Sequence, residues 1–349
     1  MTYKVASLFS GLGGMDLGIK GGFEYLGKSY PSKPFDVIYA MDFDAPTCQI
    51  YNDNFSHNCE CKDITLLETT DVPEHDILIG GFPCQSFSVS AQNPPRLGYK
   101  DQRGKLFFEM CRILKHHQPR VFIAENVKGI LSANKKKAFP LIIKEFEKAG
   151  YFVKWKILNS VDFGVPQKRE RVFIVGFRQE QDFLSFSFPK PSVSSAIPIS
   201  EILENEAEVE EKYYFSERAV NGLKASKNYK IMNKGRAQDV NGPSNTVSAH
   251  LAKVSLNSTD PVLLVNGRYR MYTPREVARI QSFPESFKLT GSKTLNYKAL
   301  GNAVAPLVMW HLASAVENVL SPFPTHQQKQ DQRTVEKMRE DFLINVITA

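Results

Sequence analysis

A glycine turn that carries a single cysteine is the strongest constraint in this 349-residue sequence. The apolar run Ile77-Leu78-Ile79 is typical of a short buried strand, and Gly80-Gly81 allows a sharp turn directly after it. Pro83 then fixes φ immediately before Cys84. Loops at the carboxyl ends of strands border the ligand crevice of an open α/β sheet, so we expect Cys84 to lie there. A small buried hydrophobic residue is the commoner role of a lone cysteine, and the local sequence leaves both roles open.

The composition is that of an ordinary globular protein, with 42% hydrophobic and 23% charged residues. A net charge of +7 favours a polyanionic partner without identifying one. The odd number of cysteines forms no disulfide framework, which indicates a reducing compartment. His57, Cys59 and Cys61 could ligate a metal, but no second ligand pair accompanies them, so no metal site is predicted. We find no signal peptide and no apolar run of about 18 residues, so we expect neither secretion nor a membrane span.

The N-terminal segment predicts a strand, a glycine turn and a helix. Residues 4–9 read as a buried strand, and Ser10-Gly11-Leu12-Gly13-Gly14 leads into a helix that contains Asp16. This arrangement is typical of a nucleotide-type pocket. A tight turn without a ligand fits equally well, because the glycine spacing is not GxGxxG.

The next two predicted strands end in acidic residues. After residues 35–40, Asp42 can accept hydrogen bonds from ribose hydroxyls, Phe43 can lie against an adenine ring, and Asp44 can cap the following helix. Asp63 ends a third short strand, where its carboxylate could accept from an exocyclic amine.

Charged residues follow two later strands. Glu125 comes directly after the apolar run 121–124, at the rim where Cys84 is expected. Arg169 and Arg171 share one face of an extended segment and suit a phosphate or an electron-rich ring edge. A solvated charged edge is the alternative.

The second half of the chain is less regular. Residues 178–243 are polar and suggest a second domain, in which the basic and amide side chains of 227–239 could contact bases and phosphates. Thr273-Pro274 with Glu276 predicts a capped helix start. Residues 300–304 are predicted to open the last helix.

Six segments together resemble the DNA (cytosine-5) methyltransferases, in the order of that family. They are Phe9–Gly14, Phe82–Gln85, Glu125–Val127, Gln167–Arg171, Arg275–Arg279 and Gly301–Val304. The resemblance implies an α/β fold with a Rossmann-like, S-adenosylmethionine-dependent methyltransferase sheet. It further implies a catalytic and cofactor-binding domain at 1–178, completed by a helix at about 300–321, and a smaller, irregular DNA-recognition domain at 179–299. The role of the tail, 322–349, is unknown.

The resemblance also implies roles for single residues. Cys84 matches the nucleophile, Glu125 the acid that engages cytosine, and Arg169 and Arg171 the substrate-side arginines. The expected S-adenosylmethionine pocket contains Phe9, Ser10, Gly11, Leu12, Gly13, Gly14, Asp42, Phe43, Asp63, Ile64, Gly81, Pro83, Leu106, Asn302 and Ala303. Ala303 departs from the serine that is common in the family. We expect DNA contacts from Gln85, Ser88, Ser90, Arg236, Gln238 and Thr246, and no metal.

The implied activity is sequence-specific methylation of carbon 5 of a flipped-out cytosine through a covalent Cys84 adduct, in a prokaryotic restriction–modification system. The expected partner is double-stranded DNA, and no membrane association is expected. The enzyme is expected in the cytoplasm, associated with the nucleoid through DNA. A cognate restriction endonuclease would act on the same site without a stable complex.

One alternative is a tRNA cytosine-5 methyltransferase, disfavoured because that branch carries a Cys-Phe-Thr motif absent here. A second is a non-catalytic DNA-binding relative, which could lose Cys84 or Glu125. A nicotinamide or flavin oxidoreductase is disfavoured by the absence of GxGxxG.

Overall fold

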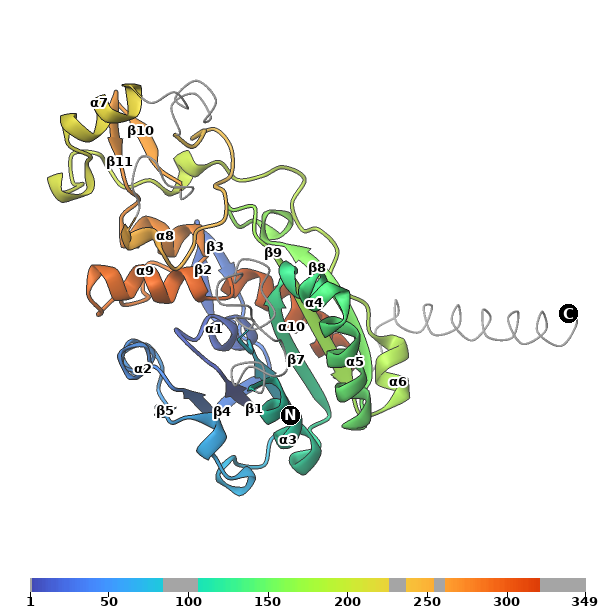
Figure 1. The fold of residues 1–349 in the computed structure, drawn as a ribbon. Helices are drawn as coiled ribbons and strands as arrows, with labels where there is room; N and C mark the ends of the chain where they lie inside the picture. The colour runs from blue at the N-terminus through green and yellow to red at the C-terminus, as the bar shows by residue number, and fades with distance from the viewer. Residues whose placement is uncertain (1, 84–105, 226–236, 254–260, 321–349) are drawn as a thin grey trace, which may run out of the picture.

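The structure, a computed structural model, describes residues 2–83, 106–225, 237–253 and 261–320. At its centre lies a seven-stranded sheet with the order β5-β4-β1-β6-β7-β9-β8 (Figure 1). The strands are β1 (Tyr3–Leu8), β4 (Phe35–Asp42), β5 (Cys59–Cys61), β6 (Ile77–Gly80), β7 (Val121–Val127), β8 (Phe152–Asn159) and β9 (Glu170–Phe177). The strands from β5 to β7 run parallel, and β9 runs antiparallel to both of its neighbours. This sheet confirms the predicted fold class.

Helices cover both faces of the sheet. Alternate side chains of β1 face opposite layers: Val5 packs with α1 (Gly14–Lys20) and α10 (Pro306–Leu320), whereas Leu8 packs with α3 (Leu106–His117) and α5 (Ala138–Lys148). Because parallel strands are buried on both faces, they read as nearly continuous apolar runs, which is why the sequence predicts them well. The described residues contain one apolar helical stretch of membrane-spanning length, Lys293–Leu320, and its apolar window is 72% buried within the protein.

The remaining elements are short. The hairpins are β2 (Phe23–Tyr25) with β3 (Lys28–Tyr30), and β10 (Leu263–Val265) with β11 (Arg268–Arg270). The other helices are α2 (Ala45–Asn52), α4 (Ala133–Lys136), α6 (Glu180–Ser185), α7 (Glu217–Ala225), α8 (Pro274–Ile280) and α9 (Lys293–Asn302). Helices α8 and α9 share a third apolar cluster with Leu12 of the glycine turn, beyond one end of the sheet in Figure 1. The domain division at residue 178 stays a prediction.

Two element boundaries differ from the sequence prediction. Residues 300–302 do not open the last helix but end α9, and α10 begins at Pro306. Proline suits the first turn of a helix because its fixed φ is helical and its missing N–H would have no partner there. The third strand ends at Cys61, and the Asp63 side chain instead accepts from Thr65 N (2.9 Å) as the cap of a 3₁₀ turn.

The predicted capped start of α8 is confirmed. Thr273 Oγ1 accepts from Glu276 N (3.1 Å), and Glu276 Oε2 accepts from Thr273 N (2.8 Å). These reciprocal bonds satisfy two donors at the helix end that would otherwise lack partners.

Candidate active site

The start of the cysteine loop lies beside Glu125. Gly80 of β6 pairs with Ala124 of β7, so the residues that follow each of them are neighbours at the sheet rim. A Cβ atom added at Gly81 would lie 3.3 Å from Glu125 Oε2. One residue further on, Asn126 Nδ2 donates to the carbonyl of Phe82 (2.9 Å). The backbone leading to Cys84 is therefore fixed against Glu125 up to Pro83. Outside the described residues lie Cys84, Gln85, Ser88, Ser90 and Arg236.

Glu125 is paired with one of the two predicted arginines. β7 and β9 run antiparallel with Val127 opposite Arg171, so Arg171 reaches back along the rim. Its Nε atom lies 3.1 Å from Glu125 Oε1. Glu125 is 9% exposed, and its burial raises the pKa of the carboxyl group, although Arg171 and Arg169 oppose that shift. A carboxyl group in this setting holds a proton at higher pH than a solvated one does.

The structure does not place Arg169 at the substrate face as predicted. Its side chain is 1% exposed, and its guanidinium donates to three backbone carbonyls. Nη1 bonds to Val247 O (3.0 Å), and Nη2 bonds to Gly301 O (2.9 Å) and Ala303 O (3.0 Å). Both Nη atoms therefore bond to the protein itself, whereas the buried Nε has no hydrogen-bond partner among the described residues. Its geometry is that of a positioning residue that joins the start of β9 to the end of α9.

The turn after β1 contains backbone conformations in the left-handed region, which residues other than glycine rarely adopt. Phe9 has a φ of 55° and Gly13 a φ of 80°, both in the left-handed region. A Cβ atom at Gly13 would overlap the ring of Phe55. Ser10 Oγ fixes the turn to two strands, because it donates to Ser7 Oγ (2.9 Å) and accepts from Met41 N (3.2 Å).

Asp42 connects this turn to the end of β4. Its Oδ2 accepts from Gly11 N (2.9 Å) and its Oδ1 from Asp44 N (3.0 Å), while burial raises the pKa of its carboxyl group. The Phe43 ring beside it is 72% exposed. An open aromatic ring next to a carboxylate suits a ligand that has a flat ring and hydroxyl groups.

Some other residues expected at the cofactor pack near the glycine turn or near the start of the cysteine loop. The carbonyl of Val304 packs so closely on Gly14 that a Cβ atom there would overlap it. The turn after α9, which includes Ala303, therefore lies against the start of α1. Ile64 is buried beside Phe82 in the apolar cluster that Leu106, the first residue of α3, partly covers.

Two residues expected at DNA are described and make bonds within the protein. Gln238 Oε1 accepts from Asn245 N (3.0 Å), and the exposed Thr246 donates to the carbonyl of Lys168 (2.7 Å). The segment 244–247 therefore lies alongside the residues that lead into β9. Arg236, expected to act with them, is outside the described ranges.

The structure also shows a buried polar network that the sequence analysis missed. Asp16 is completely buried and accepts from Tyr51 Oη (2.8 Å) and Ser7 Oγ (3.0 Å). Burial raises the pKa of its carboxyl group to about 6. The signal available in the sequence was an acid within the otherwise apolar and glycine-rich run of 14–19. Gln167 and Gln281, also buried, bond to each other (2.8 Å) and gave no comparable signal.

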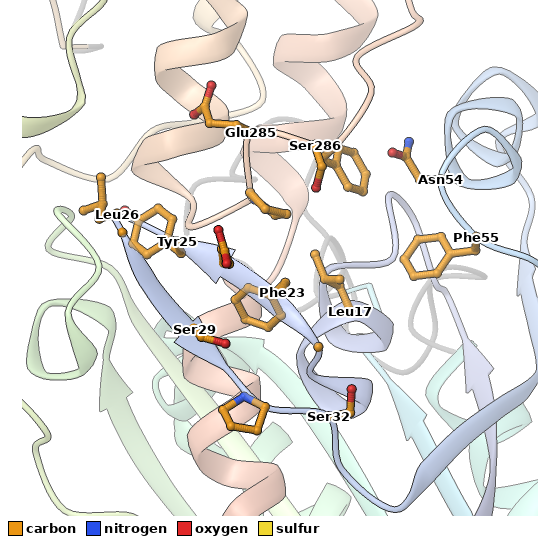
Figure 2. A pocket seen from close by; sticks show the side chains of 16 residues that line it. Leu17, Phe23, Tyr25, Leu26, Ser29, Ser32, Asn54, Phe55, Glu285 and Ser286 are labelled. Carbon is orange, nitrogen blue, oxygen red and sulfur yellow. The ribbon is translucent and has the colours of Figure 1, made fainter.

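A separate hollow of about 870 Å³ is lined in part by Phe55, whose ring packs on Gly13 of the glycine turn (Figure 2). Its wall includes the β2–β3 hairpin, Leu17, Phe55 and the turn 284–287. None of the described residues expected at the cofactor lines it, so the hollow does not represent the predicted pocket.

The sequence matches the family profile of the C-5 cytosine-specific DNA methylases over residues 3–318. The chain belongs to this family. This cytosine methylase is 36% identical to Type II methyltransferase M.DsaV of Dactylococcopsis salina, over 94% of the chain and 89% of the relative. It is 34% identical to M.NgoBI of Neisseria gonorrhoeae, over 87% of the chain and 89% of that protein.

Two solved structures share the fold of this cytosine methylase at low sequence identity. The methyltransferase EhMeth of Entamoeba histolytica has a TM-score of 0.72 at 19% identity, covering 92% of this chain and 99% of its own. The Dnmt2 methyltransferase of S. pombe has a TM-score of 0.68 at 22% identity, covering 90% and 98%. The family match identifies the enzyme as a DNA (cytosine-5) methyltransferase.

Proposed function

We propose that this enzyme is the methyltransferase of a Type II restriction–modification system and methylates carbon 5 of cytosine in duplex DNA through a covalent adduct with Cys84. One observation carries the proposal. Glu125 is buried, paired with Arg171, and adjacent to Gly81, three residues before Cys84. The names of the relatives support the assignment to a Type II system.

The chemistry explains why a thiol and a carboxyl group belong together. Carbon 5 of cytosine is a poor nucleophile until a thiolate adds to carbon 6 and turns it into an enamine carbon. Negative charge then develops toward ring N3. Glu125, whose pKa is raised by burial, would share or donate a proton there and accept a hydrogen bond from the exocyclic amine. Arg171 orients this carboxyl group and would hold the carbonyl oxygen of the base.

The rim formed by the glycine turn and β4 fits S-adenosylmethionine. Each Asp42 oxygen accepts one backbone N–H, and a carboxylate oxygen retains a second lone pair that could accept from a ribose hydroxyl. The exposed Phe43 ring would stack on adenine. When bound, this cofactor supplies an electrophilic methyl group. Phe9 through Gly14, Asp63, Ile64, Gly81, Pro83, Leu106, Asn302 and Ala303 complete the proposed pocket.

The target base must leave the DNA stack, because carbon 6 is inaccessible inside a duplex. Flipping a base costs about a few kcal/mol. We assign the compensating contacts to Gln85, Ser88, Ser90, Arg236, Gln238 and Thr246. The enzyme would act in the cytoplasm, and a cognate endonuclease would cut the same unmethylated site without forming a stable complex.

The proposal is tested with duplex DNA and total tRNA as competing substrates. Purified enzyme with labelled S-adenosylmethionine should methylate duplex DNA and leave tRNA unlabelled. Sequencing of DNA from a methylation-free host that expresses the chain should place 5-methylcytosine in one sequence context. Cys84→Ser should abolish transfer and still bind the cofactor, whereas Cys111→Ser, in the core of α3, should remain active. Transfer to tRNA alone, or turnover by Cys84→Ser, would refute the mechanism.

A further inference from the structure

Three cysteines that take no part in the proposed reaction lie close together, next to the end of β4. Cys48 lies on α2, and Cys59 and Cys61 are the first and last residues of β5. Residues two apart on a strand point to one face, and here that face packs on α2. Cys59 Sγ lies 3.6 Å from Cys48 Sγ, and Cys61, on the same face of β5, is close enough to Cys48 to affect its pKa.

The three thiols differ in their access to solvent. Cys61 is exposed, whereas Cys48 and Cys59 are only 3% and 5% exposed. A small reagent therefore reaches Cys61 first. The hydrogen bond from Cys59 lowers the pKa of the Cys48 thiol, with a smaller contribution from Cys61, although desolvation opposes the shift. Desolvation and the neighbouring Cys48 raise the pKa of Cys61, so a smaller fraction of this thiol is ionised at a given pH than in a free cysteine.

The same sulfur atoms support the backbone of the residues proposed to hold the cofactor. Cys48 Sγ donates to the carbonyl of Asp42 (3.6 Å), and Cys61 Sγ donates to the carbonyl of Phe43 (3.8 Å). A disulfide sulfur carries no hydrogen and lies about 2.05 Å from its partner, so oxidation would remove both donors and draw α2 toward β5.

We propose that Cys61 and Cys48 form a thiol–disulfide exchange site for small disulfides, and that its closure weakens cofactor binding. The Cys61 thiolate attacks one sulfur of a small disulfide, forms a mixed disulfide and releases one small thiolate. The Cys48 thiolate then attacks the Cys61 sulfur, breaks the mixed disulfide and releases the second small thiolate. The two cysteines lose two electrons and two protons, and the small disulfide leaves as two thiols. The link to cofactor binding rests on the proposed function, whereas the exchange itself does not.

The test uses the full-length protein with Cys84→Ser, which removes the proposed nucleophile as a competing thiol. The protein is incubated with glutathione disulfide, alkylated and mapped by mass spectrometry. Calorimetry then measures S-adenosylmethionine affinity before oxidation, after it, and after reduction with dithiothreitol. We expect a Cys48–Cys61 disulfide and a reversible loss of affinity of about tenfold.

Single variants separate the two steps. Cys48→Ser should stop at a mixed disulfide on Cys61. Cys61→Ser should not form the disulfide. Cys111→Ser is the matched control, because Cys111 is buried on α3 outside this cluster, and it should behave like the parent protein.

The possible outcomes are distinct. A mixed disulfide that persists although Cys48 is present, a final disulfide that includes Cys59, or unchanged oxidation of Cys61→Ser would overturn the exchange site. A Cys48–Cys61 disulfide with unchanged cofactor affinity would overturn the coupling to the rim. If the reduced protein failed to bind S-adenosylmethionine at all, the proposed function would fail, while the mapping would still decide whether exchange occurs.

Discussion

Two buried carboxyl groups show how environment sets the chemistry of a single residue. Glu125 keeps an arginine partner at the rim of the sheet, so burial and Arg171 act on its pKa in opposite directions. Asp16 has only neutral hydroxyl partners, from Tyr51 and Ser7, and burial dominates. The first arrangement suits proton donation to a substrate, and the second suits a fixed structural acceptor.

Glu125→Gln should slow methyl transfer by about 10²- to 10⁴-fold, because an amide can hydrogen-bond the base but cannot give it a proton. The rate is measured in a single turnover with saturating duplex DNA and cofactor. Glu170→Gln is the matched control, since Glu170 lies on the neighbouring strand β9 and pairs only with exposed Lys128 among the bonds described for its side chain. A loss smaller than about tenfold in Glu125→Gln would contradict a role in proton transfer.

Asp16→Asn should remove a specific pH dependence of stability. The folded pKa of about 6 lies above the ordinary 3.8, so the folded state binds this proton more tightly than the unfolded state does. The resulting stability is fully present below the unfolded pKa and is lost as pH rises through about 6. The free energy of unfolding of the parent, relative to Asp16→Asn, should therefore fall by about 3 kcal/mol from acid to neutral pH. Urea unfolding at a series of pH values measures this difference, and parallel curves would contradict it.

At the scale of elements, α8 is held by two arginine–glutamate pairs in contrasting environments. Arg270 and Glu276 are both fully buried, with Nη1 2.8 Å from Oε2, and Glu276 also accepts from Thr273 N. Arg279 and Glu285 lie equally close, at 2.7 Å, but the Glu285 side chain is 64% exposed. The two pairs have similar N–O distances but should contribute differently to the free energy of unfolding, because water screens only the second pair.

Glu276→Ala should destabilise the protein by about 3–5 kcal/mol, since it leaves the Arg270 charge buried without its main partner. Glu285→Ala, which removes the partner of Arg279 on the same helix, is the matched control and should cost at most about 1 kcal/mol. Urea denaturation at neutral pH compares the two variants with the parent. Equal costs would show that burial does not distinguish the pairs.

At the scale of the whole molecule, a net charge of +7 favours a polyanionic partner. The structure shows that this charge is not all available: Arg169 and Arg270 are fully buried and bonded within the protein. Affinity for DNA therefore depends on the basic residues that remain near the surface.

Binding of duplex DNA should weaken steeply with salt, because each phosphate neutralised by the protein releases condensed counterions. We expect the Kd to rise at least about tenfold between 50 and 200 mM salt, as a protein with only a few phosphate contacts would show. Fluorescence anisotropy with a labelled duplex measures it. A Kd that stays constant over this range would contradict an electrostatic origin of the affinity.

The sequence by itself determined where the main strands of the sheet lie along the chain, the glycine turn and the capped start of α8. These are local signals: buried strands are apolar throughout, and turns and caps need particular residues within a few positions. It also indicated that Glu125 would share a rim with the cysteine loop, because parallel strands end at one edge.

Only the tertiary structure decided where the polar side chains point. Arg169 resembled a substrate residue in the sequence, yet it bonds carbonyls 78 to 134 positions away. Asp16 accepts a hydrogen bond from Tyr51, 35 positions along the chain. Residues 300–302 end α9, so the last helix begins at Pro306 and not at residue 300 as expected. Such partners depend on how whole elements pack, since a buried polar group must bond whichever groups the fold brings to it.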